Sequence, residues 1–507
     1  MWQMRTHPRG LYVLFFAEMW ERFSYYGMRA LLIFYLTQHF LFERDAAYGI
    51  YGAYTTLVYI MPVIGGALAD RYLGQRKAIM MGAVLLVAGH GLMAVEGEPT
   101  AAGSDPSPIV LNIFYFALAL IIIGTGFLKA NISALVGELY TKTDKRRDSA
   151  FTLFYVGINL GAFFGALIAG YLGQTFGWSY GFGAAGIGML AGLAVFVIGK
   201  PTLRGAGEPP NLALLKKPVV SGLSLQNLIY LGTAGAIILV WYLVRDQDTV
   251  GVLLVATSVL TLGYILWRSV TKLEPHARDR IFAALFLIIV QVLFWALFEQ
   301  AGSSLNIYTD EQVDRTIFGQ EIVASVFQSL NAMYIVLLGP LFAAVWGFLA
   351  RRGHEPTAPQ KFGFGIIQLG LGFLILVWGD QGSAGLTPVV FIFLIYLLHT
   401  TGELCLSPVG LSAMTRLSVA SMVGLIMGTW FLATAFGNYV ASKIAQLTER
   451  PDSSVIEIYG NVGWLAVGVG VAMVAVAPLI NRFMHLDTLK DDMGAEDHKP
   501  VPAEGHA

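Results

Sequence analysis

Seven ionisable side chains lie inside stretches of the sequence that are otherwise apolar. They are Glu18, Glu21, Arg22, Arg29, Lys129, Glu299 and Glu403. A charged side chain that faces lipid at mid-depth costs at least about 2.5–3.5 kcal/mol, so all seven would cost on the order of 20 kcal/mol, more than the net stability of a fold. We therefore expect them to face a shared interior, to pair with one another and to contact water.

The spacing of the first few of these residues predicts a polar stripe on one helix. At about 100° per residue, Glu18, Arg22, Tyr25 and Arg29 fall within about 60° of one another, and Glu21 lies about 60° from Glu18. The rest of this segment is apolar or aromatic. The stripe would run along about three helical turns and turn its charges toward neighbouring helices.

The balance of charge suggests what the group could do. Four carboxylates and three bases leave one negative charge, which a dry cavity disfavours, so one carboxylate is expected to accept a proton. A site with both signs also suits a zwitterion: the bases would hold its carboxylate, and an acid on the opposite half its ammonium. The alternative for each residue is a fixed ion-pair network that only orders the helices.

The elements that would position these residues are membrane-spanning helices. The chain has 507 residues, of which 56% are hydrophobic and 13% charged, against about 25% charged in a soluble domain. Apolar stretches long enough to cross the bilayer recur along the whole chain. They predict an all-α membrane protein with fourteen spans at about 11–40, 47–69, 77–95, 109–138, 149–173, 180–199, 225–244, 249–267, 281–301, 321–349, 362–378, 388–415, 421–447 and 460–483.

The loops between these spans predict the orientation. With alternating loops, 24 Lys and Arg residues gather on one side and five on the other, and positive charge favours the cytoplasmic side. Both termini are therefore predicted to be cytoplasmic, in a multi-pass protein of the cell inner (plasma) membrane. Gly157, Gly161 and Gly165 recur every four residues, which predicts a helix face that a neighbouring helix approaches closely.

Changes in composition divide the chain into four parts. We expect a six-helix bundle at 1–200, a linker with an inserted two-helix hairpin at 201–278, a second six-helix bundle at 279–485, and a disordered cytoplasmic tail at 486–507. Two six-helix halves suit alternating access around a site at mid-depth. The alternative is a fourteen-helix protein without such pseudosymmetry, because no clear repeat relates the halves.

Several function classes lack their residues here. The net charge of −1 gives no basic surface for nucleic acid, and one cysteine, Cys405, cannot form a disulfide or a cysteine-based metal site. There is no Walker-type ATP motif and no nucleophile–base or metal-ligand constellation. We expect a carrier driven by the proton gradient, with no cofactor, metal or catalytic residue, and a monomer.

Four motifs, in order along the chain, resemble a known family. They are EMWERFSYYG at 18–27, GGALADRYLGQRK at 65–77, FYVGINLGA at 154–162 and FWALFEQAGSSLNIY at 294–308. They resemble signatures of the proton-dependent oligopeptide transporter (POT/PTR) family, a branch of the major facilitator superfamily. The resemblance implies two six-helix bundles with two inserted helices, and a bacterial transporter of di- and tripeptides.

The resemblance also implies roles in proton coupling and gating. Glu18, Glu21 and Arg22 would form a proton-linked cluster with Lys129, and Glu299 would take part in coupling. Arg29 and Glu299 would pair across the halves as a gate. Asp70, Arg71 and Arg76 would steady the closed state at a cytoplasmic helix junction, unless that motif serves topology alone. Animal members of the family have a proton-linked histidine in the second span. This chain has none there, so the glutamates alone would have to carry the proton. His90 and His399, which lie in other spans, are expected to be ordinary core residues.

The remaining implied roles concern the substrate. Arg22 and Lys129 would face the peptide carboxylate, and the peptide amino end would meet three polar side chains, namely Asn159, Asn331 and Glu403. Further binding residues are expected to be Arg29, Glu299 and Ser407. Five aromatic side chains, which could instead serve packing or interfacial anchoring, would shape the side-chain pockets: Tyr25, Tyr26, Tyr59, Trp295 and Trp430.

Two other functions remain open at this point. Some plant relatives of the family carry nitrate, so a carrier of nitrate or another small anion is the alternative within the same fold. A membrane enzyme or receptor is the third possibility. An intact stripe at 18–29 together with an acid for an ammonium favours peptides.

Overall fold

Helices of membrane-spanning length dominate the structure, a computed structural model that describes residues 7–141, 144, 146–220, 222–382 and 385–486. Within these residues, thirteen helices are long and apolar enough to cross a membrane. The helix Arg9–Phe34 adds a fourteenth span. It is not among the thirteen because it contains several charged residues, most of which are buried in the structure. The tail predicted to be disordered lies, from residue 487 onward, outside the described residues.

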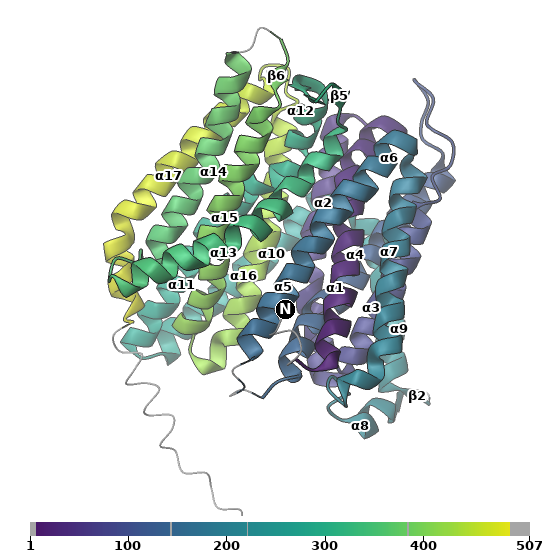
Figure 1. Ribbon diagram of the computed structural model, residues 1–507. Helices are drawn as coiled ribbons and strands as arrows, with labels where there is room; N and C mark the ends of the chain where they lie inside the picture. Colours follow the sequence, from purple (N-terminus) through teal and green to yellow (C-terminus); the bar gives the residue numbers. More distant parts are fainter. Residues whose placement is uncertain (1–6, 142–143, 145, 221, 383–384, 487–507) are drawn as a thin grey trace, which may run out of the picture.

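The first six spans form the N-bundle, drawn in purple and blue in Figure 1. Its helices are α1 Arg9–Phe34, α2 Arg44–Leu68, α3 Gln75–Met93, α4 Pro108–Glu138, α5 Arg147–Phe164, α6 Gly170–Phe176 and α7 Trp178–Gly199. Three π-helical turns, Tyr35–His39, Ala69–Leu73 and Gly165–Ala169, extend α1 and α2 and join α5 to α6 into one span.

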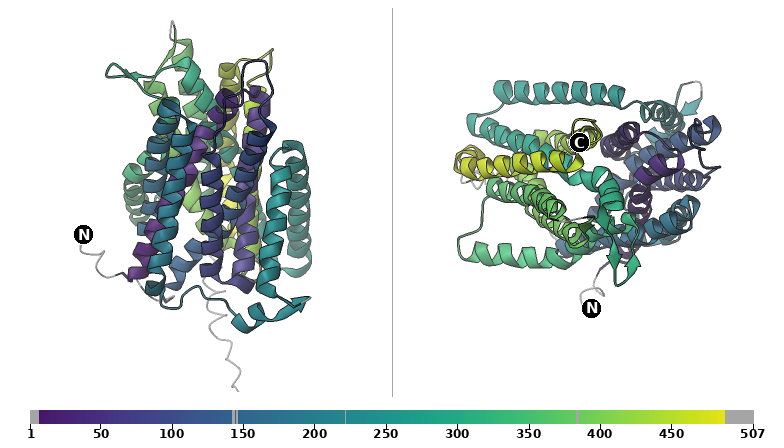
Figure 2. Two further views of the ribbon diagram at one scale, coloured as in Figure 1. Left: turned by 90° about the vertical axis from the view of Figure 1, so that its right-hand side faces the viewer. Right: turned by 90° about the horizontal axis from the view of Figure 1, so that it is seen from above.

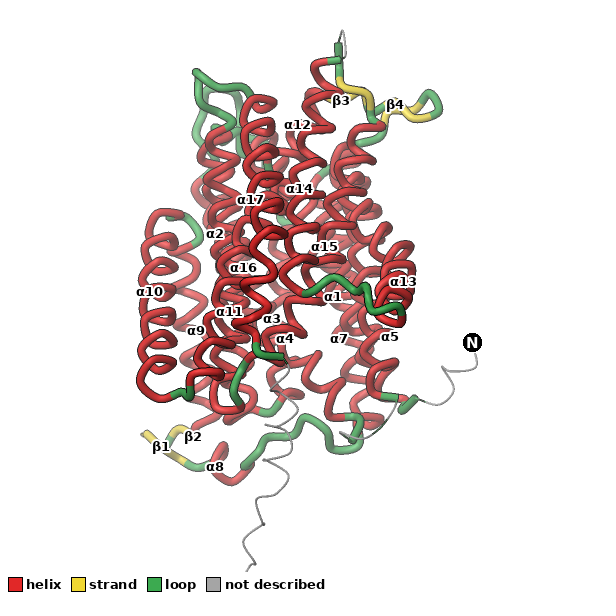
Figure 3. Tube along the Cα trace, turned by 90° about the vertical axis from the view of Figure 1, so that its left-hand side faces the viewer, coloured by secondary structure: helices red, strands yellow, loops and turns green. Residues whose placement is uncertain are grey.

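A linker and a helical hairpin follow the N-bundle. The linker holds a 3-10 turn Lys200–Leu203, the short helix α8 Leu212–Lys216, and the antiparallel strands β1 Pro218–Val220 and β2 Leu223–Ser224. The hairpin consists of α9 Leu225–Leu243 and α10 Gln247–Lys272. It stands at the edge of the molecule, beside both bundles (Figures 2 and 3).

The last six spans form the C-bundle, drawn in teal, green and yellow. Its helices are α11 Pro275–Phe298, α12 Ser304–Gln312, α13 Ser329–Arg351, α14 Ala358–Gln381, α15 Val390–Leu417, α16 Val423–Leu447 and α17 Val455–Met484. Its strands are two residues long each: β3 Val313–Asp314 pairs in parallel with β6 Thr387–Pro388, and β4 Thr316–Ile317 pairs antiparallel with β5 Gln320–Glu321. Local sequence sets several starts, as in α14, where Thr357 and Gln360 form a reciprocal cap.

The bundle has two distinguishable ends. We call the end where α1 begins and α17 finishes the terminal end, and the end that carries α12 and strands β3–β6 the distal end (Figures 1 and 3). All fourteen predicted spans correspond to helices, so the predicted fold class is confirmed. The short helix α12 was not predicted.

The glycine face predicted on α5 packs against α1. A Cβ at Gly157 would lie 2.8 Å from the Phe15 ring, and one at Gly165 would overlap the Phe23 backbone. An added Cβ at Gly161 would likewise overlap the Met19 carbonyl. The predicted close approach is confirmed, and it fixes the helix that carries the charged stripe.

Candidate functional site

The stripe on α1 begins with a buried cluster of two acids and one base. Glu18, Glu21 and Arg22 are each 3% exposed or less. Arg22 Nε lies 3.1 Å from Glu18 Oε1 and donates a hydrogen bond to Glu21. The second oxygen of each acid and Arg22 Nη2 are buried and find no hydrogen-bond partner among the described residues. One base therefore meets two acids, and the cluster retains free capacity for a proton, water or a further cation.

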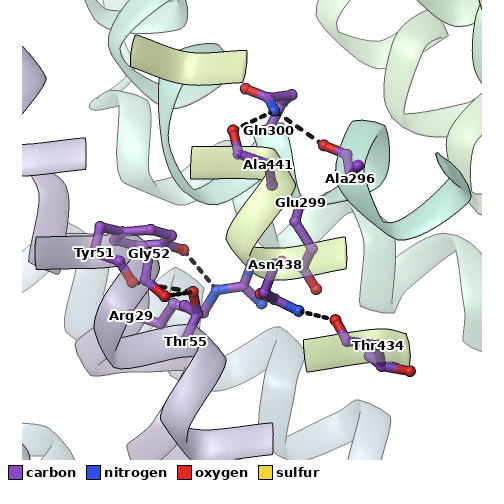
Figure 4. Close-up of polar contacts among 10 residues, drawn as sticks. All are labelled: Arg29, Tyr51, Gly52, Thr55, Ala296, Glu299, Gln300, Thr434, Asn438 and Ala441. Atoms are coloured by element: carbon purple, nitrogen blue, oxygen red, sulfur yellow. Dashed lines mark hydrogen bonds and ion pairs between the residues drawn. The ribbon is translucent and has the colours of Figure 1, made fainter. Parts of the chain in front are cut away.

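The other end of the stripe joins the two bundles. Arg29 of α1 forms a buried ion pair with Glu299, at the end of α11, and its Nε donates a 2.8 Å hydrogen bond to Tyr51 of α2 (Figure 4). The two charged side chains are 8% and 3% exposed. Because both are out of water, each depends on the other, and separation of the bundles at this depth would expose two unpaired charges.

A side chain next to Glu299 fixes this part of α11. Gln300 is fully buried, and its Nε2 donates to the carbonyls of Ala296, at 3.0 Å, and Ala441 of α16, at 2.8 Å (Figure 4). The acid thus stands on a turn that is tied to a second helix of its own bundle. Sequence reasoning missed Gln300 and Tyr51; the position of Gln300 beside Glu299 is the signal that could have found it.

A cavity of about 100 Å³ lies between the bundles at this ion pair. Seven predicted site residues line it: Tyr26, Arg29, Tyr59, Trp295, Glu299, Asn331 and Glu403. The wall is completed by Phe298, Ala301, Gln328, Tyr396 and His399. The structure therefore brings residues from both bundles to one central cavity, which includes His399, a residue expected to be ordinary core. Its spacing of four from Glu403, which puts both on one helix face, was the available signal.

Glu403 is held ready on the C-bundle side of the cavity. Asn331 of α13 donates through Nδ2 to Glu403 Oε2, at 2.9 Å, and to Thr400 Oγ1, at 3.1 Å. This arrangement commits the amide N–H groups of Asn331 and orients the carboxylate. An acid and an amide oxygen are thus available to a ligand that carries N–H donors.

Lys129 of the N-bundle lies against a residue of the cavity wall but does not itself line the cavity. Its Nζ is 4.4 Å from the centre of the Tyr59 ring, which lines the cavity, and it has no ion-pair partner within 4 Å among the described residues. Tyr25 packs edge-on against Tyr26, with ring centres 5.1 Å apart, and lies behind the cavity wall. The N-bundle therefore contributes positive charge and aromatic rings.

Six predicted binding residues are not among the residues that line the cavity: Arg22, Tyr25 and Lys129, described above, and Asn159, Ser407 and Trp430. Asn159 donates to the Tyr155 carbonyl one turn before it, at 2.9 Å. Ser407 follows Glu403 by one turn of α15 and is half-buried. Trp430 is 3% exposed and packs on Gly410, where an added Cβ would overlap its ring. Direct ligand contact for these six remains a prediction.

The predicted junction motif lies between α2 and α3. Asp70 accepts from Gln75 Nε2 at 3.0 Å, and the Arg71 guanidinium lies 5.5 Å from the Tyr72 ring. Arg76 pairs with Glu208 of the linker at 2.7 Å. These contacts stay within the N-bundle and its linker, so they tie the motif to one half.

The two bundles are joined at the distal end. Arg44 of α2 pairs with Glu311 of α12 and lies 3.7 Å from Glu449, which follows the end of α16. Gln38 donates to Asp310 of α12 at 3.2 Å. Further bonds run from Asn306 Nδ2 to the Ala30 carbonyl, at 3.2 Å, and from Gln446 Nε2 to the Asp45 carbonyl, at 3.0 Å. The central cavity is therefore closed toward this end.

A second cavity, of about 410 Å³, lies at the terminal end of the C-bundle. Lys361, Arg416 and Ser412 contribute to its wall, and none of the predicted site residues does. In the described part of the chain no group of three or more His, Cys, Asp or Glu residues could hold a metal ion. The central cavity is thus the candidate site.

The fold and the central cavity define a class of protein. Two six-helix bundles meet at a central cavity lined by residues of both, as in secondary transporters of the major facilitator superfamily. Residues 76–465 match the model of the POT family, and the chain belongs to that family. It is a transporter and not an enzyme.

Individual relatives cover nearly the whole chain. A peptide transporter of Yersinia enterocolitica, YePEPT, is 36% identical over 86% of this chain and 87% of its own length. Dipeptide and tripeptide permease A of Cronobacter turicensis is 31% identical over 96% of this chain and 95% of its own. A crystal structure of a peptide transporter POT variant in complex with alafosfalin superposes with a TM-score of 0.81, at 34% identity, covering 94% of this chain and 96% of that one.

Proposed function

We propose that the protein carries di- and tripeptides across the membrane together with protons, by alternating access. The observation that carries this proposal is the distribution of charge around the central cavity. Arg29, which lines the cavity, and Lys129, which lies against the lining residue Tyr59, belong to the N-bundle. Glu403 and Glu299, which both line the cavity, belong to the C-bundle. A short peptide with free ends has a carboxylate for the first pair and an ammonium for an acid of the second.

The cluster on α1 supports a role in proton coupling. Glu18, Glu21 and Arg22 hold two acids against one base, so the uptake of one proton brings the cluster to neutrality. Lys129 stands ready between this cluster and the cavity, without an ion-pair partner within 4 Å among the described residues. In this proposal, proton binding at the cluster frees the bases to hold the peptide carboxylate.

The ion pair between Arg29 and Glu299 acts as a gate in this proposal. The pair, with the contacts of Arg44 and Gln38, keeps the distal side shut. Protonation of Glu299 would cancel the attraction and allow the distal side to open. We propose that the distal end faces the outside and that both termini lie in the cytoplasm, in a bacterial inner membrane; the asymmetry of Lys and Arg between the loops supports this orientation.

The proposal includes the working unit, the energy source and the terminal end. The unit that works is a monomer, whose N-bundle (1–200) and C-bundle (279–485) move about the cavity, with the hairpin segment 201–278 between them. The proton gradient supplies the energy, and no cofactor takes part. Asp70 and Arg71 are proposed to steady the terminal end when it is closed.

Uptake into liposomes tests the function directly. We expect purified protein to accumulate labelled dialanine when an inward proton gradient is imposed, with acidification of the liposome interior, and to accumulate no nitrate. Protein-free liposomes provide the baseline. Transport of nitrate without dialanine would overturn the peptide assignment, and dialanine equilibration that ignores the gradient would overturn proton coupling.

Replacing Glu403 should separate peptides by their amino ends. Glu403→Gln keeps the size of the side chain and its bond with Asn331 but removes the charge that pairs with an ammonium. We expect binding of dialanine to weaken about tenfold, in the range of a charge-assisted hydrogen bond, while N-acetylated dialanine binds equally to both proteins. Competition against a labelled peptide measures both affinities, and equal losses for the two ligands would contradict this contact.

A further inference from the structure

The hairpin of α9 and α10 is held to the N-bundle through α9. Near the distal end, Trp241 Nε1 donates to the Asn112 carbonyl at 3.2 Å, and Arg245 donates to the Asn112 side chain at 2.8 Å. At the terminal end, Lys77 of α3 hydrogen-bonds Gln226 of α9. One helix of the hairpin is thus fixed at both of its ends to the N-bundle.

The other helix, α10, reaches the C-bundle. Gln247 donates through Nε2 to Ser442 of α16, and Lys443 Nζ lies 3.2 Å from both Gln247 Oε1 and Asp248 Oδ1. Gly251, one turn further, packs on Tyr439, whose hydroxyl an added Cβ would overlap. The distal half of α10 is therefore bound to α16 by polar bonds and by close packing.

Gln247 itself lies in the seam where the two bundles meet. Gln247 is only 8% exposed, and α2 and α16 pack directly against each other. A Cβ at Gly49 of α2 would lie 3.1 Å from Gln247 Oε1, and one at Gly52 would lie 3.2 Å from Gln247 Nε2. The glycines of α2 thus leave the space that the amide fills, while its hydrogen bonds go to α16.

This arrangement has a mechanical consequence. α9 moves with the N-bundle, whereas Ser442 and Lys443 move with the C-bundle. If the distal end opens, α2 and α16 separate. The amide of Gln247 then cannot keep both its packing against Gly49 and Gly52 of α2 and its hydrogen bonds to α16. Opening therefore costs the amide either its packing on α2 or its bonds to α16, and it makes both contacts only while the distal end is closed.

We propose that the inserted hairpin is a brace on the distal half of the α2–α16 seam, and that Gln247 is the positioning residue through which it favours the closed state. The brace acts outside the transport cavity. It adds to the distal contacts of Arg44 and Gln38 a bond whose strength does not depend on substrate.

Distances between the bundles test this proposal. Spin labels at Ala101→Cys and Asp452→Cys, in full-length protein with Cys405→Ser, sit on exposed distal loops of the two halves. Measured without substrate at a series of pH values, Gln247→Ala should raise the ratio of long to short distances at least about fivefold, as expected when one hydrogen bond or more is lost. Ser442→Ala removes one of these hydrogen bonds from the other side and should shift the ratio in the same direction, about fivefold.

Gln226→Ala is the matched control. It makes the same substitution in the same hairpin, but breaks a bond to the N-bundle only, so its distance distribution should equal that of the unsubstituted protein. An unchanged distribution in both Gln247→Ala and Ser442→Ala would overturn the brace, and so would an equal shift in Gln226→Ala, which would indicate general loosening. Dialanine counterflow by the unsubstituted protein, assayed in parallel, tests the transport function separately.

Discussion

Liposomes that contain the Glu18→Gln variant should fail to concentrate dialanine under a proton gradient, although they still exchange it. A gradient of about two pH units supplies about 2.7 kcal/mol per proton, which supports about a hundredfold accumulation in a coupled carrier. Without coupling, the ratio of internal to external dialanine falls to about one, the value at equilibrium. The change is therefore expected to remove the whole driving force while leaving the path for the peptide in place.

The physical reason lies in the cluster on α1. Glu18 Oε1 is 3.1 Å from Arg22 Nε, and Glu18 Oε2 is buried without a hydrogen-bond partner among the described residues. Glutamine has nearly the same size and can still bond, but it carries no charge in any state. The cluster would then be neutral throughout the cycle, with Arg22 paired to Glu21, and could neither bind nor release a proton at this position.

Counterflow distinguishes lost coupling from a lost fold. With equal pH on both sides, exchange of labelled for unlabelled dialanine should continue in Glu18→Gln at a rate within a few-fold of the unsubstituted protein. Glu457→Gln, the same change at an exposed site in the first turn of α17, should keep both activities. If Glu18→Gln accumulates dialanine normally, Glu18 has no part in coupling.

Much of the fold follows from sequence for a simple reason. A helix that crosses the bilayer must be a long apolar segment, so each span can be recognised from the hydropathy of the sequence. All fourteen spans were predicted in this way. Helix α12 was missed because Ser304–Gln312 is short and polar, and its helical state depends on burial against neighbours and not on an apolar face. The strands were also not predicted, because each has only two or three residues and lies in a loop between spans.

The charged residues of the candidate site could be predicted from the sequence, but the uncharged residues that contact them could not. The cost of charge in lipid identifies Arg29, Glu299 and Glu403 from their surroundings alone. It does not reveal that Arg29 also donates a hydrogen bond to Tyr51, or that Gln300 fixes the turn that carries Glu299. The reason is that an uncharged polar residue costs much less free energy in the membrane than a charged one. Nor does it reveal that the Trp430 ring fills the space above Gly410, which depends on how α15 and α16 pack.

Removing one member of the central ion pair should harm the protein more than removing both. In Arg29→Gln, Glu299 remains buried with no opposite charge, and such a change costs about 3–5 kcal/mol. We expect a lower melting temperature and loss of both accumulation and counterflow. In Arg29→Gln/Glu299→Gln, two amides of similar size replace the charges, so the melting temperature should return to near that of the unsubstituted protein.

The double variant also tests whether this pair is the gate. With no charge to release, the distal end no longer depends on protonation of Glu299, so counterflow should recover while proton-driven accumulation stays absent. Arg44→Gln/Glu311→Gln is the matched control. It removes another ion pair between the bundles, but one whose side chains are 38% and 41% exposed, where such a pair contributes about 0–1 kcal/mol.

The comparison of the two ion pairs distinguishes a pair that only holds the bundles together from a pair that takes part in proton coupling. The exposed pair should shift the melting temperature little and leave accumulation intact, since water and salt screen it in every state. The buried pair is different because its two charges are stable only together or when the acid is neutral. If Arg29→Gln/Glu299→Gln concentrates dialanine as the unsubstituted protein does, the buried pair serves assembly alone and protonation must open the distal end through another acid.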